Sequence, residues 1–162
     1  VDDRPEAVTR SPSTSLLEAD GGAAVRRLLD QAGTTEFHPW VARFAEGLEP
    51  IPSAELTALL EQTDSFRSEM LAFMESYDAI LCPVRAFAAL PHGEGQKIRG
   101  SGSYTSVFNV TGWPATVVRA GESSEGLPIG VQLVARPWRE DVSLALAGLV
   151  ESALGGWKRP GI

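Results

Sequence analysis

The sequence predicts an α/β fold, with a mixed β-sheet flanked by helices, and three observations lead to this class. Residues 15–77 carry apolar side chains mostly at helical spacing. Residues 78–134 contain short apolar or β-branched runs bounded by proline and glycine, as strands are. Residues 141–154 are again amphipathic with helical spacing. The resulting order of helices, strand, helix, hairpin and helix is typical of layered α/β proteins.

The composition is that of a globular protein with one core. The chain has 162 residues, of which 43% are hydrophobic and 22% charged, close to globular averages. The net charge is -7, and the 14 lysines and arginines form no basic run, so we expect no nucleic-acid partner. No apolar run approaches the roughly 20 residues that span a bilayer, so we expect no membrane association. Cys82 is the single cysteine, which excludes an internal disulfide and is compatible with the cytoplasm, where we expect the protein.

Residues 1–14 are predicted to be a loop or linker, because they are polar and are interrupted by Pro5 and Pro12. The first residues also lack an initiator methionine and the charged and apolar regions of a signal peptide. We therefore expect the chain to begin inside a longer reading frame.

The first predicted helix runs from Ala23 to Ala32. Asp20 precedes it as the expected N-cap, and Gly33 follows its C-terminus. A rival start lies at residues 15–18, which have capping-box spacing. That start would place Gly21 and Gly22 inside the helix at a cost of about 1 kcal/mol each.

Two more helices are predicted before the strands. A short helix is expected at residues 40–47, between prolines. Ser53 then caps a long helix that reaches about Tyr77. Its broad apolar face consists of Leu56, Leu59, Leu60, Phe66, Met70, Leu71, Phe73 and Met74.

Residues 78–162 are predicted to hold the sheet. The run Asp78–Val84 suits a buried strand, because it is short and apolar and contains Pro83 near its end. Residues 85–103 lack periodicity and form a loop. The remaining predicted elements are a short helix at Tyr104–Val110, an antiparallel hairpin of strands Ala115–Val118 and Ile129–Val134, and a helix at Asp141–Leu154 ended by Gly155-Gly156.

Several motifs, taken in order, resemble the C-terminal section of amidase signature enzymes. From Tyr77 onward these are YDAILCP, LPHG, YTSVFNVTGWPA and GLPIGVQLV. Upstream, ADGG at residues 19–22 and FHPW at residues 37–40 resemble the general amidase or acetamidase-like branch. The likeness covers residues 19–154, and the order and spacing of the motifs make it specific.

The resemblance implies the C-terminal part of the amidase signature fold, with residues 1–162 as one segment of it. The family hydrolyses amides with a serine nucleophile, a second serine in a cis peptide and a lysine base. A Gly/Ser-rich segment carries the serines and supplies N–H groups for the oxyanion, as amide cleavage requires. No cofactor and no metal ion is expected.

The sequence departs from the family at the catalytic segment. It contains no Gly-Gly-Ser-Ser-Gly-Gly run, and its only lysines, Lys97 and Lys158, precede no such run. We therefore expect no catalytic residue in this chain and no activity of the chain alone. The expected partners are a small-molecule amide substrate and the N-terminal catalytic part of the same protein, with a homodimer as a further expectation. The alternatives are a non-catalytic binding or interaction module, such as one component of an amidotransferase-type assembly, and an unrelated Cys/His hydrolase.

The resemblance places the helix Tyr104–Val110 beside the substrate channel. Gly102, Ser106 and Asn109 are three or four residues apart and share a face, and Phe108 and Trp113 could add apolar contacts. The competing interpretation is core packing for Phe108 and Trp113, and helix capping for Asn109.

Other candidates have structural interpretations that we favour. Cys82 with His92 could form a thiol–imidazole pair, but Cys82 is expected to be a buried core residue. His38 and His92 have no spacing that suggests a metal site. The remaining candidates are Gly100-Ser101-Gly102-Ser103 as a loop, Ser123-Ser124 as a solvated turn, Asp2-Asp3 as a solvated pair, and Gly93-x-Gly95 without a dinucleotide-binding context.

Overall fold

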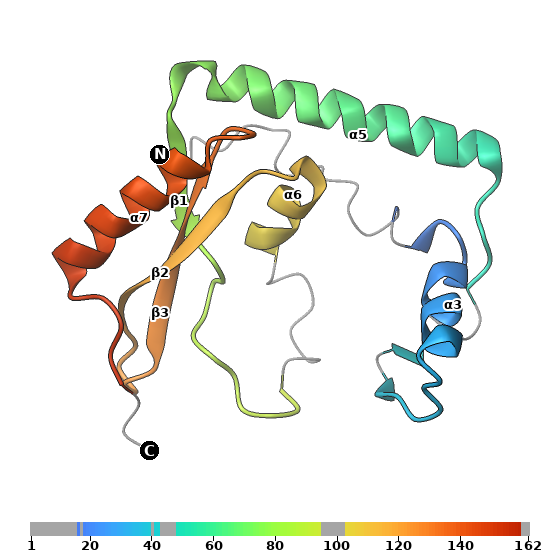
Figure 1. Ribbon diagram of the computed structural model, residues 1–162, viewed down its shortest axis with the longest axis horizontal. Coiled ribbons are helices and arrows are strands. Elements are labelled where there is room, and N and C mark those ends of the chain that lie inside the picture. The colour runs from blue at the N-terminus through green and yellow to red at the C-terminus, as the bar shows by residue number, and fades with distance from the viewer. Residues whose placement is uncertain (1–15, 17, 40, 43–47, 95–102, 160–162) are drawn as a thin grey trace. The chain divides into compact units, whose positions relative to one another are not determined.

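A computed structural model describes residues 16, 18–39, 41–42, 48–94 and 103–159 of the chain. The chain divides into two compact units, Arg10–Phe66 and Arg67–Ile162, and each is described by itself. Figure 1 traces the helices and strands of both.

The first unit contains the predicted helix as α3, Ala23–Gln31. The carboxylate of Asp20 accepts the backbone N–H groups of Gly22 (2.9 Å) and Ala24 (2.7 Å) at its start. The bond from Ala24 is the largest cause that lowers the pKa of Asp20 below its ordinary value. Asp20 thus accepts backbone N–H groups at the start of the helix as predicted, but the N-cap residue is Gly22 and not Asp20. The rival start is wrong, because Gly21 and Gly22 both have positive φ and lie in a turn ahead of the helix.

The turn at Gly21 is packed against a segment far along the sequence. A Cβ atom at Gly21 would lie 2.8 Å from both the carbonyl oxygen of Leu48 and the nitrogen of Pro50. The backbone N–H of Ile51 donates to the carbonyl of Ala19 nearby, at 3.0 Å. Only glycine fits this position, since it has both positive φ and a close backbone neighbour. Of the short helix predicted at 40–47, residues 41 and 42 are helical and residues 40 and 43–47 lie outside the described part.

The long helix is confirmed as α5, Ser53–Phe73, continued by the 3₁₀-helix η1, Met74–Ser76. Its buried side recurs every three or four residues, at Thr63, Phe66, Met70 and Met74. Leu60 and Leu71, which the sequence placed on the apolar face, are exposed. The hydroxyl of Thr63 is buried and donates to the carbonyl of Leu59 at 2.8 Å, so a polar residue can occupy the buried stripe.

The second unit contains a sheet of three strands, β1 (Ala79–Pro83), β2 (Ala115–Glu122) and β3 (Pro128–Ala135). The strand order is β1-β3-β2, and both pairings are antiparallel. The predicted hairpin of β2 and β3 is confirmed. β1 is an outer strand of the described sheet, and Leu81 is 63% exposed. The expectation that this strand is buried is therefore wrong, because a strand with a single neighbour leaves part of its surface uncovered.

Helices lie on both sides of this sheet, as Figure 1 shows. On one side is α7 (Glu140–Leu154), whose Ser143 hydroxyl shares a hydrogen bond of 3.0 Å with the hydroxyl of Thr116 on β2. On the other side is α6 (Ser103–Thr111), whose Tyr104 carbonyl accepts a bond from Gln132 on β3. The register of the sheet agrees with this arrangement. Thr116 lies opposite Leu133 and shares its face of the sheet, whereas Gln132, the neighbour of Leu133 on β3, faces the other way. The helices predicted at 104–110 and 141–154 are thus confirmed.

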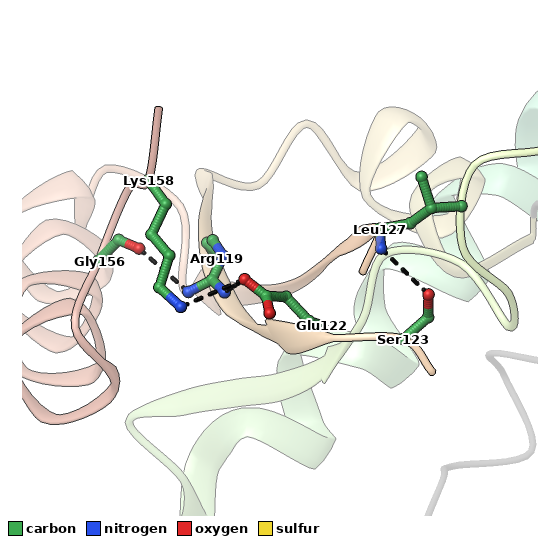
Figure 2. Close-up of polar contacts among 6 residues, drawn as sticks. All are labelled: Arg119, Glu122, Ser123, Leu127, Gly156 and Lys158. Carbon is green, nitrogen blue, oxygen red and sulfur yellow. Dashed lines mark hydrogen bonds and ion pairs between the residues drawn. The ribbon is translucent and has the colours of Figure 1, made fainter. Parts of the chain in front are cut away.

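Gly156 and Lys158, which follow α7, contact the hairpin through the polar contacts shown in Figure 2. Arg119 donates to the carbonyl of Gly156 (3.3 Å) and pairs with Glu122, and the Lys158 ammonium lies 3.2 Å from the same carboxylate. The hydrogen bond from Lys158, followed by that from Arg119, lowers the pKa of Glu122 below its ordinary value.

The hairpin loop is a turn, as predicted for Ser123-Ser124. The hydroxyl oxygen of Ser123 accepts the N–H groups of Glu125 (3.3 Å) and Leu127 (3.2 Å). This is the serine turn that a hydroxyl provides to nearby backbone donors. In the part of the chain that the structure describes, no helix combines the length and apolar character needed to cross a membrane.

The substitution Gly21→Ala should destabilise the chain by about 2 kcal/mol or more, because it adds a side chain at positive φ and against backbone atoms. The matched control is Gly33→Ala. Gly33 has a similar φ of 61°, but a Cβ there meets nothing within 4 Å, so only the conformational cost of about 1 kcal/mol is expected. Urea denaturation of the two variants measures the difference, and equal losses would refute the close approach at Gly21.

Cys82 should react slowly with thiol reagents at neutral pH. It is half-buried, and burial raises the pKa of its thiol, an effect that the neighbouring side-chain amide of Gln132 partly offsets. Because the thiolate is the reactive form, labelling should be several-fold slower in the native chain than in denaturant, and should accelerate as the pH rises. As the single cysteine, Cys82 gives an unambiguous signal. Cys82→Ala should cost about 1 kcal/mol through the cavity it leaves. Equal labelling rates in native and denatured chains would contradict the burial.

Candidate functional site

The candidate channel residues fall on and beside α6, with different exposures. Ser106 is half-buried and Asn109 is exposed, and their spacing of three residues places them on one face of the helix. Phe108 and Trp113 are buried, at 8% and 6% exposure. Gly102 lies outside the described residues. The structure thus combines a small polar pair on α6 with buried apolar side chains on the helix and just after its end.

The apolar side of α6 fixes it in the core of its unit. Val107 and Val110 are buried together with Phe108. The helix ends at Gly112, which has a φ of 70° and donates its N–H to the carbonyl of Phe108 at 2.9 Å. The half-buried Ser106 and the exposed Asn109 lie on the side of the helix away from these buried residues.

Both ends of α6 are also held by side chains from other elements. The amide nitrogen of Gln132 donates to the carbonyl of Tyr104 at 2.9 Å, in the first turn. The Nε of Arg67, on α5, donates to the carbonyl of Val110 at 3.0 Å, in the last turn. A cation at the C-terminal carbonyls is favourable because the helix dipole is negative there.

The sequence interpretation missed Gln132 and Arg67. A signal for Gln132 was present, since it is the one amide side chain in the apolar strand Ile129–Val134. A buried polar residue in such a strand must have partners. No comparable signal marks Arg67, because an arginine on a long amphipathic helix is ordinarily a solvated residue.

The remaining candidates do not assemble into a second site. His92 lies in an exposed turn, whereas Cys82 contacts the amide of Gln132. His38 is exposed, and the described residues contain no group of three or more His, Cys, Asp or Glu that could hold a metal ion. Lys158 pairs with Glu122. The candidates Asp2-Asp3, Gly95, Lys97 and Gly100-Ser101 lie outside the described residues.

The first unit contains a hollow that the sequence did not indicate. It has a volume of about 400 Å³ and is lined by Glu18, Leu48, Glu49, Ile51, Glu55, Ala58, Leu59 and Gln62. The lining combines apolar side chains with three carboxylates and includes no basic residue. It is built from three separate stretches of sequence, and for that reason no local motif predicts it.

Comparison with known proteins agrees with the resemblance of the motifs. A relative from Danio rerio, fatty-acid amide hydrolase 2-A, is 36% identical over 103 residues, covering 64% of this chain and 19% of that protein. A glutamyl-tRNA(Gln) amidotransferase subunit from Methylocella silvestris is 40% identical over 91 residues, covering 51% of this chain and 18% of that protein. The chain therefore spans less than a fifth of the length of either relative.

Solved structures confirm the α/β fold class. A 6-aminohexanoate cyclic dimer hydrolase, solved with its substrate, superposes with a TM-score of 0.73 at 25% identity, over 99% of this chain and 39% of that one. A fatty acid amide hydrolase superposes with the same TM-score of 0.73 at 20% identity, over 96% of this chain and 33% of that one, which shows the shared fold. The family model described as Amidase matches residues 6–144. Since this match takes in most of the sequence, the chain belongs to the amidase family.

Proposed function

We propose that this chain is the C-terminal part of an enzyme that hydrolyses carbon–nitrogen amide bonds, and that it supplies scaffold and one wall of the substrate channel. The observation that carries the proposal is the family match over residues 6–144. The relatives named fatty-acid amide hydrolase and cyclic dimer hydrolase are amide-cleaving enzymes by name, and this chain corresponds to a minor share of each.

The chemistry of amide cleavage supports a division between this chain and residues outside it. An amide is a poor electrophile, so cleavage needs an activated nucleophile and donors aimed at the developing oxyanion. The sequence holds no Gly-Gly-Ser-Ser-Gly-Gly run and no lysine ahead of one. What α6 offers is the small polar pair Ser106 and Asn109 beside buried apolar side chains, a combination that suits a pocket wall.

The chain alone should therefore show no amidase activity. The assay measures amine or ammonia released from acetamide, an aryl amide and a long-chain fatty amide by the pure 162-residue chain, with heat-denatured chain as the control. Hydrolysis above the control that survives alkylation of Cys82 would refute the proposal. Hydrolysis that alkylation abolishes would instead support the Cys/His hydrolase.

In the enzyme that carries this chain, Ser106→Trp should narrow the channel. The KM for bulky amides should rise about tenfold or more, with a smaller change for acetamide and little change in kcat. The control is Leu144→Trp, because Leu144 is exposed on α7, across the sheet from α6. Steady-state kinetics with acyl groups of increasing size measures the effect. Equal losses for small and large substrates, or loss of folding, would place Ser106 in packed core.

A second candidate function is that of one component in an amidotransferase-type assembly. The observation that favours it is the 40% identity to the glutamyl-tRNA(Gln) amidotransferase protein of Methylocella silvestris. The two candidates differ in whether the enzyme that carries this chain hydrolyses simple amides without another polypeptide. Turnover by the purified single polypeptide supports the hydrolase, and turnover that requires a second polypeptide supports the assembly.

A further inference from the structure

One buried side chain, Gln132, connects three elements of the second unit. It lies on the central strand β3 and is 2% exposed. Its Nε2 donates to the carbonyl of Pro83 at 3.0 Å and to the carbonyl of Tyr104 at 2.9 Å. Since a primary amide carries two N–H groups, these two bonds use its whole donor capacity.

The two acceptor carbonyls lie at the end of β1 and at the start of α6, the next described helix along the chain. Pro83 is the last residue of β1, and Tyr104 is the second residue of α6. A single side-chain amide therefore fixes the distance between the end of β1 and the start of α6. Because β3 is paired on both sides, the amide itself is anchored in the most constrained strand of the sheet.

The geometry requires glutamine in particular. Glutamate has the same length but no N–H to donate, and methionine has neither donor nor acceptor of comparable strength. Asparagine keeps the amide but is shorter by one methylene. A buried amide is tolerated at this position only because both of its donors are satisfied.

We propose that Gln132 is a positioning residue that fixes the first turn of α6 and so sets the width of the substrate channel at Ser106. This inference rests on the proposed function, in which α6 is a channel wall. Ser106 follows Tyr104 by two residues, so a shift of the Tyr104 carbonyl moves Ser106 with it. The far end of α6 stays fixed by the bond from Arg67 to Val110, and loss of Gln132 therefore tilts the helix about that end.

The same sheet provides a matched control. Thr116 on β2 shares its hydrogen bond with Ser143 of α7, on the face opposite to α6. Thr116→Val removes one part-buried polar contact between the sheet and a helix but leaves the supports of α6 in place. Gln132→Met removes one such contact with α6 and, in addition, the bond to Pro83 of β1. A change at α6 that occurs in Gln132→Met but not in Thr116→Val therefore results from loss of the support of α6, and not from loss of a buried polar contact in general.

The first test measures hydrogen exchange in the 162-residue chain. Gln132→Met should speed exchange of the α6 backbone amides on the order of tenfold relative to those of β2, whereas Thr116→Val should leave the α6 amides unchanged. Gln132→Asn is the second variant and should show the same pattern. In the wild-type chain, both Nε2 protons of Gln132 should exchange more slowly than those of the exposed Gln62. Fast exchange of the Gln132 protons, or unchanged α6 amides in the variants that fold, overturns the proposal.

The second test uses the enzyme that carries the chain. Gln132→Met and Gln132→Asn should change KM by a factor that depends on acyl size, with a smaller change in kcat, and Thr116→Val should not. A loss that is equal across acyl sizes, or that falls on kcat alone, overturns the positioning role. Absence of amide hydrolysis by the wild-type enzyme would overturn the proposed function and the control of specificity with it. The exchange result would still decide whether Gln132 fixes α6.

Discussion

The amide of Gln132 joins α6 to the sheet of the second unit, which no backbone ladder does. β1 and β2 are held to β3 by antiparallel pairing, but α6 belongs to no ladder and is short. Helices of this length are marginal in water and take their order from packing and fixed ends. The bond from Gln132 to the Tyr104 carbonyl supplies the fixed N-terminal end, and the buried Val107 and Phe108 supply the packing.

A second long side chain near β3, that of Arg136, also bonds to backbone carbonyls of another element. Arg136, directly after β3, donates to the carbonyls of Met74 and Tyr77 and so satisfies groups left at the end of η1. Its Nε is the one side-chain N or O atom of the described residues that is buried without a partner. The guanidinium is held by two bonds, and the unpartnered Nε is the cost of placing a cation where the chain turns from the sheet toward α7.

The sequence predicted best where one local rule decides the structure. Helical spacing located α5 and α7, and the rule that a short acidic side chain accepts backbone N–H groups at the start of a helix located Asp20. β-branched runs around a turn located the hairpin. The prediction was wrong where the outcome depends on neighbours, as for β1, since a short apolar run looks the same in an outer and a central strand. The candidate site was predictable in part for the same reason. The motifs around α6 indicated the family and the helix, but the supports of that helix come from Arg67 and Gln132, far away in sequence.

Membership of the amidase family limits what this chain can contribute to a reaction. Groups that act on the transition state alone change kcat, and the sequence contains no run that would carry such groups for amide cleavage. A wall that contacts the substrate equally before and during reaction changes KM. Under the proposed function, the small polar pair on α6 and the two long-range bonds that hold the helix would act on KM in this way. Selection of the substrate by size is therefore the role that we propose for this chain in the enzyme that carries it.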